Sequence, residues 1–223
     1  MRHLIRMDDF PHGDRNLYTQ QKECYDVEVQ TIIDIFERNQ VDYIWGVSPL
    51  LCEERHFEAL DTIHHGRIVM HGFSHGFDNV EDWHRVTECW ANGGEFSFFT
   101  KDEMAAEYEK CHQLLRRFAT YDPRHFIPPF NCFNQDLVDV LRTKGVQYIH
   151  SCDQEWLKYQ QGQIKYRGLE PIVSELYNSY DYVDRVLSRL DGLDSQITLH
   201  WMYDIQHSGW ESNYNKLAER LST

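Results

Sequence analysis

The chain has 223 residues, 41% of them hydrophobic and 14% aromatic, with 22 basic side chains against 36 acidic ones and a formal net charge of −14. A chain of this length can bury one large core, so we expect a single domain over residues 1–223. The acidic charge argues against a nucleic-acid partner, because proteins that bind phosphate backbones need a basic face.

Apolar runs alternate with amphipathic stretches along the whole chain. We expect strands over residues 3–7, 41–47, 67–70, 125–127, 146–150, 171–176 and 196–200. We expect helices over residues 20–39, 54–64, 101–119, 135–143, 180–190 and 211–221. A strand followed by a helix, repeated in this way, predicts an α/β fold with a mostly parallel sheet, either closed as a barrel or open and doubly wound.

Two of the expected helices carry clear boundary residues. Thr100 followed by Glu103 spells a capping box at the start of the third helix. Asn134 is a typical N-cap for the fourth, and Gly145 is the kind of residue that ends a helix in the left-handed conformation.

Acidic and histidine side chains stand where the expected strands end. Asp8 and Asp9 follow the first strand, His71 follows the third, and His150 and His200 close the fifth and the last. In both kinds of parallel sheet the working residues gather at the carboxyl ends of the strands. We therefore expect these side chains to converge.

The pair His71 and His75 is a candidate for metal ligation. Two imidazoles, a carboxylate from another strand and an open position for water would form a catalytic zinc site, with other first-row divalent metals as the next choice. Gly72 replaces the glutamate of the HExxH pattern, so the general base must come from elsewhere. A hydrogen-bonded histidine pair in a turn is the alternative reading.

The pair Asp8 and Asp9 also has a structural alternative, since aspartate favours turns and helix starts. However, two carboxylates that close an apolar strand are costly to bury without a cation or hydrogen-bond donors, which favours a site.

Taken together, these residues resemble the motifs of the NodB-homology polysaccharide deacetylases, carbohydrate esterase family 4, and of its divergent members in particular. The matching pieces occur in family order and span nearly the whole chain: Asp8-Asp9, His71-Gly72-Phe73-Ser74-His75, Pro128-Pro129-Phe130 and Leu199-His200. The resemblance implies an incomplete (β/α)₇ barrel.

The resemblance also implies roles for individual residues. Asp8 would be the catalytic base, and Asp9 would bind one divalent metal, zinc by preference, together with His71 and His75. His200 would be the general acid, and Phe130 would offer its backbone N–H to the oxyanion.

The chain departs from the family pattern at one catalytic position. The arginine that usually lies two residues before the proline of the third motif is Ile127 here. Arg6 lies two residues before Asp8 on the same strand and would point to the same face, so we expect it to be the substitute, with Arg124 as second choice.

The fourth motif is only faintly present. Asp153 is the candidate to orient His200, and Trp156 could form a sugar-stacking wall, although core packing is the alternative for Trp156.

The activity that the resemblance implies is metal-dependent hydrolytic removal of the N-acetyl group of an amino sugar in a surface polysaccharide or its precursor. The alternatives are another metal-dependent amide or phosphoester hydrolase, or a catalytically silent glycan-binding barrel, since a fold does not fix the bond that is cleaved.

The start of the chain bears on the compartment. It lacks the apolar stretch of a secretory signal, and no run of 18 apolar residues could span a bilayer. On that basis we expect a cytoplasmic protein and a lipid-linked or nucleotide-linked substrate.

Overall fold

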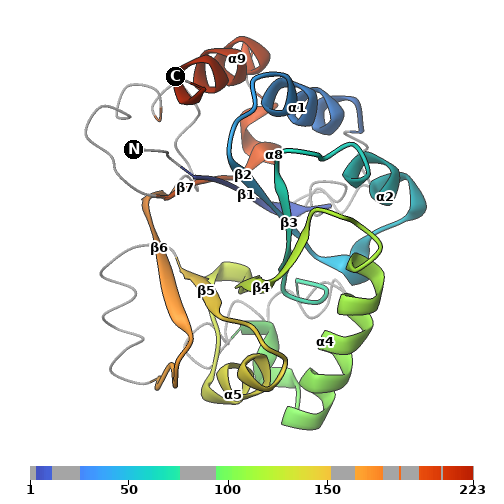
Figure 1. Ribbon diagram of the computed structural model, residues 1–223, viewed down its shortest axis with the longest axis vertical. Coiled ribbons are helices and arrows are strands. Elements are labelled where there is room, and N and C mark those ends of the chain that lie inside the picture. Colours follow the sequence, from blue (N-terminus) through green and yellow to red (C-terminus); the bar gives the residue numbers. More distant parts are fainter. Residues whose placement is uncertain are drawn as a thin grey trace.

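Seven parallel strands form a closed barrel in the described part of the chain (Figure 1). The computed structural model describes residues 4–11, 26–75, 94–151, 164–177, 186, 196–206 and 208–222. The strands follow one another in sequence order around the barrel, and β7 pairs back onto β1. The expected (β/α)₇ barrel is confirmed; it is incomplete in having one strand fewer than the eight-stranded (β/α)₈ barrel.

Each of the seven predicted strands has a counterpart in the structure. The strands are β1 (Ile5–Phe10), β2 (Tyr43–Val47), β3 (Arg67–His71), β4 (Tyr121–Ile127), β5 (Tyr148–Ser151), β6 (Glu170–Tyr177) and β7 (Gln196–Leu199). The first strand runs further than predicted, so that Asp8 and Asp9 lie within β1 rather than after it.

The longer helices lie outside the ring of strands, along the top, right and bottom of the view in Figure 1. The described helices are α1 (Asp26–Arg38), α2 (Glu54–Leu60), α4 (Lys101–Leu115), α5 (Gln135–Thr143), α8 (Trp201–Asp204) and α9 (Trp210–Leu221), with the short 3₁₀ turns η2 (Pro49–Leu51), η5 (Gly94–Phe98) and η6 (Pro129–Asn131). The helix expected over 180–190 lies outside the described residues except for position 186. Among the helices described here, none combines the length and the apolar character needed to cross a bilayer.

The predicted helix boundaries are confirmed where caps were identified. The Thr100 side chain accepts a hydrogen bond from the Glu103 backbone N–H, and the Glu103 side chain accepts one from the Thr100 N–H. Asn134 accepts from the Leu137 N–H at 2.9 Å at the start of α5, and Gly145 follows that helix with a φ of 83°.

The two faces of the barrel strands differ in character. On the outer face, residues such as Ile5, Met7 and Trp45 belong to the large apolar core under the helices. The inner face holds a separate apolar cluster of Ile44, Val69 and Ile127. Because side chains alternate along a strand, Arg6 and Asp8 point to the face opposite Ile5 and Met7, into the barrel.

Candidate active site and metal centre

The structure brings Asp9, His71 and His75 together. The Asp9 Oδ1 atom lies 2.8 Å from His71 Nε2 and 2.9 Å from His75 Nε2. Both imidazoles are buried, and these ligand atoms all lie within 4.8 Å of one another. Among the described residues they are the one group of three or more His, Cys, Asp or Glu side chains arranged in this way.

The hydrogen bonds of His71 fit a cation at this position. Its Nδ1 faces the carbonyl oxygen of Ile127 at 3.1 Å, so Nδ1 carries the hydrogen, and in a neutral imidazole Nε2 then holds a lone pair. That lone pair faces the carboxylate of Asp9, which is also an acceptor. Either a second proton or a cation must lie between them, and a divalent metal would satisfy both imidazoles and the carboxylate at once.

A bulge in β1 lets two consecutive aspartates face one site. Three residue steps separate Met7 and Phe10, whereas their partners on β2, Trp45 and Val47, are two steps apart. Asp9 has a φ of 67° within this bulge. The irregularity breaks the strict alternation of the strand and re-aims a side chain, as bulges beside active sites commonly do.

The loop after β3 aims the second imidazole. Gly72 has a φ of 63° and His75 a φ of 58°, so the chain turns sharply twice between the two histidines. The Phe73 N–H donates to the buried carboxylate of Glu95 at 2.9 Å, and the Ser48 hydroxyl donates to the His71 carbonyl at 2.7 Å. These contacts fix the loop in the conformation that brings His75 to Asp9.

Asp8 is held by Arg6 inside the barrel. The guanidinium Nε donates to Asp8 Oδ1 at 2.7 Å, and Nη2 donates to Asp8 Oδ2. Arg6 is fully buried and Asp8 is 2% exposed. The arrangement is a bidentate pair, the geometry in which arginine binds a carboxylate most strongly.

The charge of Arg6 decides the ionisation of Asp8. Burial on its own would raise the pKa of the Asp8 carboxyl, but the positive charge of Arg6, with a smaller contribution from His71, outweighs burial and the pKa lies below its ordinary value. The pKa of Asp9 is held well below its usual range, because the neighbouring His75 and His200 outweigh the effect of burial. Both carboxylates are therefore ionised at neutral pH.

His200 and Phe130 border the same group of residues. His200 follows β7, is 5% exposed, and places its Nε2 3.7 Å from Asp9 Oδ2. Phe130 lies in η6 after β4, where its ring meets the ring of His75 edge-on with centroids 4.6 Å apart. The carboxyl ends of β1 and β3 and the turns after β3, β4 and β7 thus meet at one place.

One residue of this cluster was not predicted from the sequence. Asn131 is 4% exposed, and its Oδ1 lies 3.3 Å from Arg6 Nη2. Its position directly after the proline-aromatic motif was the available signal, but a single asparagine in a loop has too many ordinary explanations to single it out.

Other predicted residues lie elsewhere or outside the described part of the chain. His150 does not join the metal group, because its two ring nitrogens contact His125 at 3.1 Å and Gln196 at 2.8 Å inside the barrel. Arg124 pairs with Asp122 and not with Asp8. Asp153 and Trp156 lie outside the described residues.

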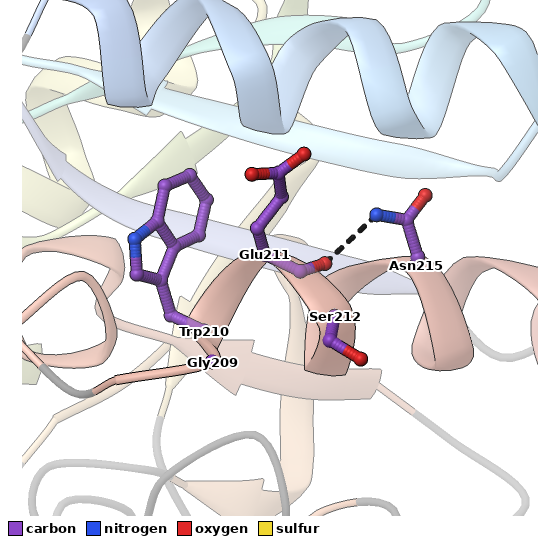
Figure 2. Close-up of a pocket in the computed structure, with 5 residues that line it drawn as sticks. All are labelled: Gly209, Trp210, Glu211, Ser212 and Asn215. Atoms are coloured by element: carbon purple, nitrogen blue, oxygen red, sulfur yellow. Dashed lines mark hydrogen bonds between the residues drawn. The ribbon is translucent and has the colours of Figure 1, made fainter.

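A surface depression of about 550 Å³ lies at the start of α9 and is separate from this group. Figure 2 shows the residues that line it: Gly209, Trp210, Glu211, Ser212 and Asn215. None of them belongs to the cluster around Asp9.

The fold and the cluster define a class, a parallel (β/α)₇ barrel with an Asp-His-His group beside a buried Arg-Asp pair. No family model and no curated protein matches the chain, whereas solved structures do. A family 4 carbohydrate esterase from Streptomyces lividans, in complex with acetate, is 12% identical with a TM-score of 0.57, over 99% of this chain and 85% of that one.

Two further structures show how varied the relatives of this barrel are. A 4-alpha-glucanotransferase from Thermococcus litoralis is 12% identical with a TM-score of 0.61, over 97% of this chain and 38% of that one. A family 4 pseudoenzyme from Bacillus anthracis is 10% identical with a TM-score of 0.53, over 99% of this chain and 60% of that one. The chain has the fold of the family 4 carbohydrate esterases, as its motifs predicted, and the low identity accords with a divergent sequence.

Proposed function

We propose that this protein is a metal-dependent hydrolase that removes the N-acetyl group from an amino sugar of a glycan, releasing acetate and a free amine. The observation that carries the proposal is the buried, arginine-paired Asp8 directly beside the group of Asp9, His71 and His75. An ionised base next to a metal site is the arrangement that amide hydrolysis needs.

Asp9, His71 and His75 would hold the metal. Two nitrogen donors and one oxygen donor with open positions suit zinc, and other first-row divalent metals can use the same set. When bound, a divalent metal lowers the pKa of a coordinated water and polarises the acyl oxygen of the substrate.

Asp8 would take the proton of the attacking water. The Arg6 charge keeps this carboxylate ionised at neutral pH, so it can accept a proton, and the bidentate contact fixes the direction of its oxygens. Arg6 thereby fills the place of the arginine that the family carries on another strand.

The other two roles concern the charge that develops during the reaction. The backbone N–H of Phe130 would donate to the oxyanion of the tetrahedral intermediate. His200 would protonate the amine nitrogen, because an amide anion is too poor a leaving group to depart alone. Asp153 as the partner of His200 and Trp156 as a sugar-stacking wall stay predictions.

The substrate class follows from the same proposal. An N-acetylated amino sugar in a surface polysaccharide or its biosynthetic precursor is the expected target. The solved esterase with acetate in its structure supports an acetyl-releasing reaction on this fold.

A silent glycan-binding barrel is the second candidate. One of the solved structures that share the fold is described as a pseudoenzyme, so the barrel can exist without turnover.

Acetate release decides between the two candidates. The purified protein, loaded with zinc or cobalt, is incubated with N-acetylated chito-oligosaccharides and peptidoglycan fragments, and acetate and free amine are measured. Equimolar acetate and amine, absent with chelated protein and with Asp8→Asn, support the deacetylase. Glycan binding without acetate release supports the silent barrel and excludes the enzyme for those sugars.

A further inference from the structure

Asn131 is a buried polar residue with an unusual backbone. It is 4% exposed, its φ is 54°, and its backbone N–H donates to the Pro128 carbonyl at 3.0 Å. Asparagine tolerates the left-handed region better than most residues with a side chain, although glycine would tolerate it at lower cost. The presence of a side chain at this position therefore calls for a reason beyond the turn.

The side chain of Asn131 contacts the arginine that holds Asp8. Its Oδ1 lies 3.3 Å from Arg6 Nη2, the same nitrogen that donates to Asp8 Oδ2. That nitrogen has two hydrogens, so one can go to each oxygen. Because a guanidinium offers only donors, the amide must turn its oxygen toward Arg6, which settles the orientation of the side chain.

A neutral acceptor suits this position better than a charged one. A carboxylate at 131 would share the positive charge of Arg6 with Asp8 and would add a like charge near it. An amide satisfies the guanidinium hydrogen without drawing its charge away from Asp8.

The same segment also contacts the start of the loop after β3. The Ile127 carbonyl accepts the Gly72 N–H at 3.0 Å and faces His71 Nδ1 at 3.1 Å. Phe130 lies between this point and Asn131, with its ring against His75. The segment from the end of β4 through η6 is thus fixed to His71 and Gly72 at one end and to Arg6 at the other.

We propose that Asn131 is a positioning residue that holds the Arg6–Asp8 pair in register with the backbone of Phe130. It acts through Arg6 on the carboxylate of Asp8, and through the left-handed turn on the backbone N–H next to it. This role rests on the deacetylation proposed above, since both groups are positioned for that reaction.

Two substitutions at 131 separate the backbone from the amide. Asn131→Gly keeps the left-handed turn and removes the contact, and it should lower kcat about tenfold with KM changed by less than about twofold, since small misplacements of catalytic groups act on kcat. Asn131→Asp keeps the shape and adds a charge, and it should lower kcat further, by about a hundredfold. Asn131→Gly should leave metal affinity unchanged, which is measured by titration.

Asn134→Gly is the matched control. It removes another asparagine side chain of the same loop, the N-cap of α5, whose contacts are to Leu137 and Phe96 and not to Arg6. It should lower thermal stability and leave kcat of the folded protein unchanged. If it lowers kcat as much as Asn131→Gly, the role assigned to Asn131 is wrong.

A double-mutant cycle with Arg6→Lys tests whether Asn131 acts through Arg6. In the Arg6→Lys background, the activation free energy derived from kcat should change on Asn131→Gly by less than half of its change in the wild type. The reason is that the side chain that Asn131 contacts has been replaced. The same cycle is measured on denaturant midpoints, which need no turnover, and should also be non-additive. Additive effects in the unfolding cycle would overturn the proposal. A wild type that releases no acetate would instead count against the proposed function, and the unfolding cycle would still decide the role of Asn131.

Discussion

At the scale of single residues, each of the three candidate metal ligands can be removed by a point mutation. His71→Ala and His75→Ala each delete one nitrogen donor from a set of three, and we expect metal content to fall well below one equivalent. His64→Ala, which removes an exposed histidine, is the control and should retain the metal. The measurement is elemental analysis after dialysis, and metal retained at wild-type level in both variants would exclude this site.

Asp8 should behave differently from the ligands. Asp8→Asn preserves the shape of the side chain beside Arg6 but cannot accept a proton, so we expect the metal to stay and turnover to fall by roughly two to four orders of magnitude. Metal content and acetate release are measured on the same sample. Loss of the metal in this variant would mean that Asp8 and Asp9 have exchanged roles.

His200 can be tested through the leaving group. A general acid matters for an amide and hardly matters for an activated aryl ester, which leaves without a proton. His200→Ala should therefore lose much more activity on an N-acetyl sugar than on an aryl acetate. Equal losses on both substrates would indicate that His200 shapes the site or contacts the oxyanion.

At the scale of elements, the turn after β3 depends on glycine at position 72. Gly72 has a φ of 63°, and a Cβ there would lie 2.3 Å from Pro129 Cγ and 2.4 Å from Glu95 Oε1. We expect Gly72→Ala to cost about 2 to 4 kcal/mol, from backbone strain and overpacking together, and to weaken metal binding because the loop carries His75.

Gly145→Ala is the matched control for that substitution. Gly145 has a φ of 83°, but a Cβ there would meet nothing within 4 Å. It should cost about 1 to 2 kcal/mol from backbone strain alone and leave the metal in place. Denaturant unfolding and metal titration compare the two. If Gly72→Ala and Gly145→Ala lose the same stability and the same metal affinity, the close approach of position 72 to Pro129 and Glu95 has no effect of its own.

Element types were predictable from the sequence because the strands are short apolar runs bounded by polar turns. The residues at which the elements begin and end were harder to predict. The start of β4 was missed because Asp122, Pro123 and Arg124 suggest a turn, although the strand begins at Tyr121.

Some features of the candidate site could also be predicted from the sequence, and others could not. Arg6 beside Asp8 follows from the alternation of a strand, and the spacing of His71 and His75 indicates a pair. The left-handed residues Asp9 and Asn131 could not be foreseen, since such conformations depend on contacts with other elements and not on residue type alone.

At the scale of the whole molecule, the barrel encloses two buried histidines in addition to its inner apolar cluster. His125 and His150 are 7% and 0% exposed and contact each other at 3.1 Å. Burial lowers the pKa of His125 to about 4, in spite of nearby Asp122, and burial with the charge of Arg6 lowers the pKa of His150 well below its ordinary value. Both are therefore neutral in the folded protein at neutral pH.

These histidines should make the fold sensitive to acid. Their folded pKa values lie below the ordinary value of 6.5, so the unfolded chain binds more protons as the pH falls from about 6.5 toward 4, and stability present above this window is lost within it. His125 alone should account for about 2 kcal/mol between pH 7 and pH 5.

Denaturant unfolding at the two pH values measures this loss. His125→Asn keeps an N–H near the position of Nδ1 but cannot take up a proton. It should therefore reduce the loss of stability between pH 7 and pH 5. The exposed His64→Asn should leave it unchanged. If His125→Asn shows the full wild-type loss, the buried histidine pair is not its source.

The bulge in β1 has a consequence for changes in chain length. Without Asp9, the strand would read Ile5, Arg6, Met7, Asp8 and Phe10, with a regular alternation that still sends Ile5, Met7 and Phe10 to the apolar core. Asp9 is thus the extra residue of the bulge, and the barrel does not need it to satisfy its own pattern. A deletion of one codon would leave an intact barrel that has lost the carboxylate shared by His71 and His75. If Asp9, His71 and His75 bind a metal as proposed, this single deletion would remove one of the three candidate ligands.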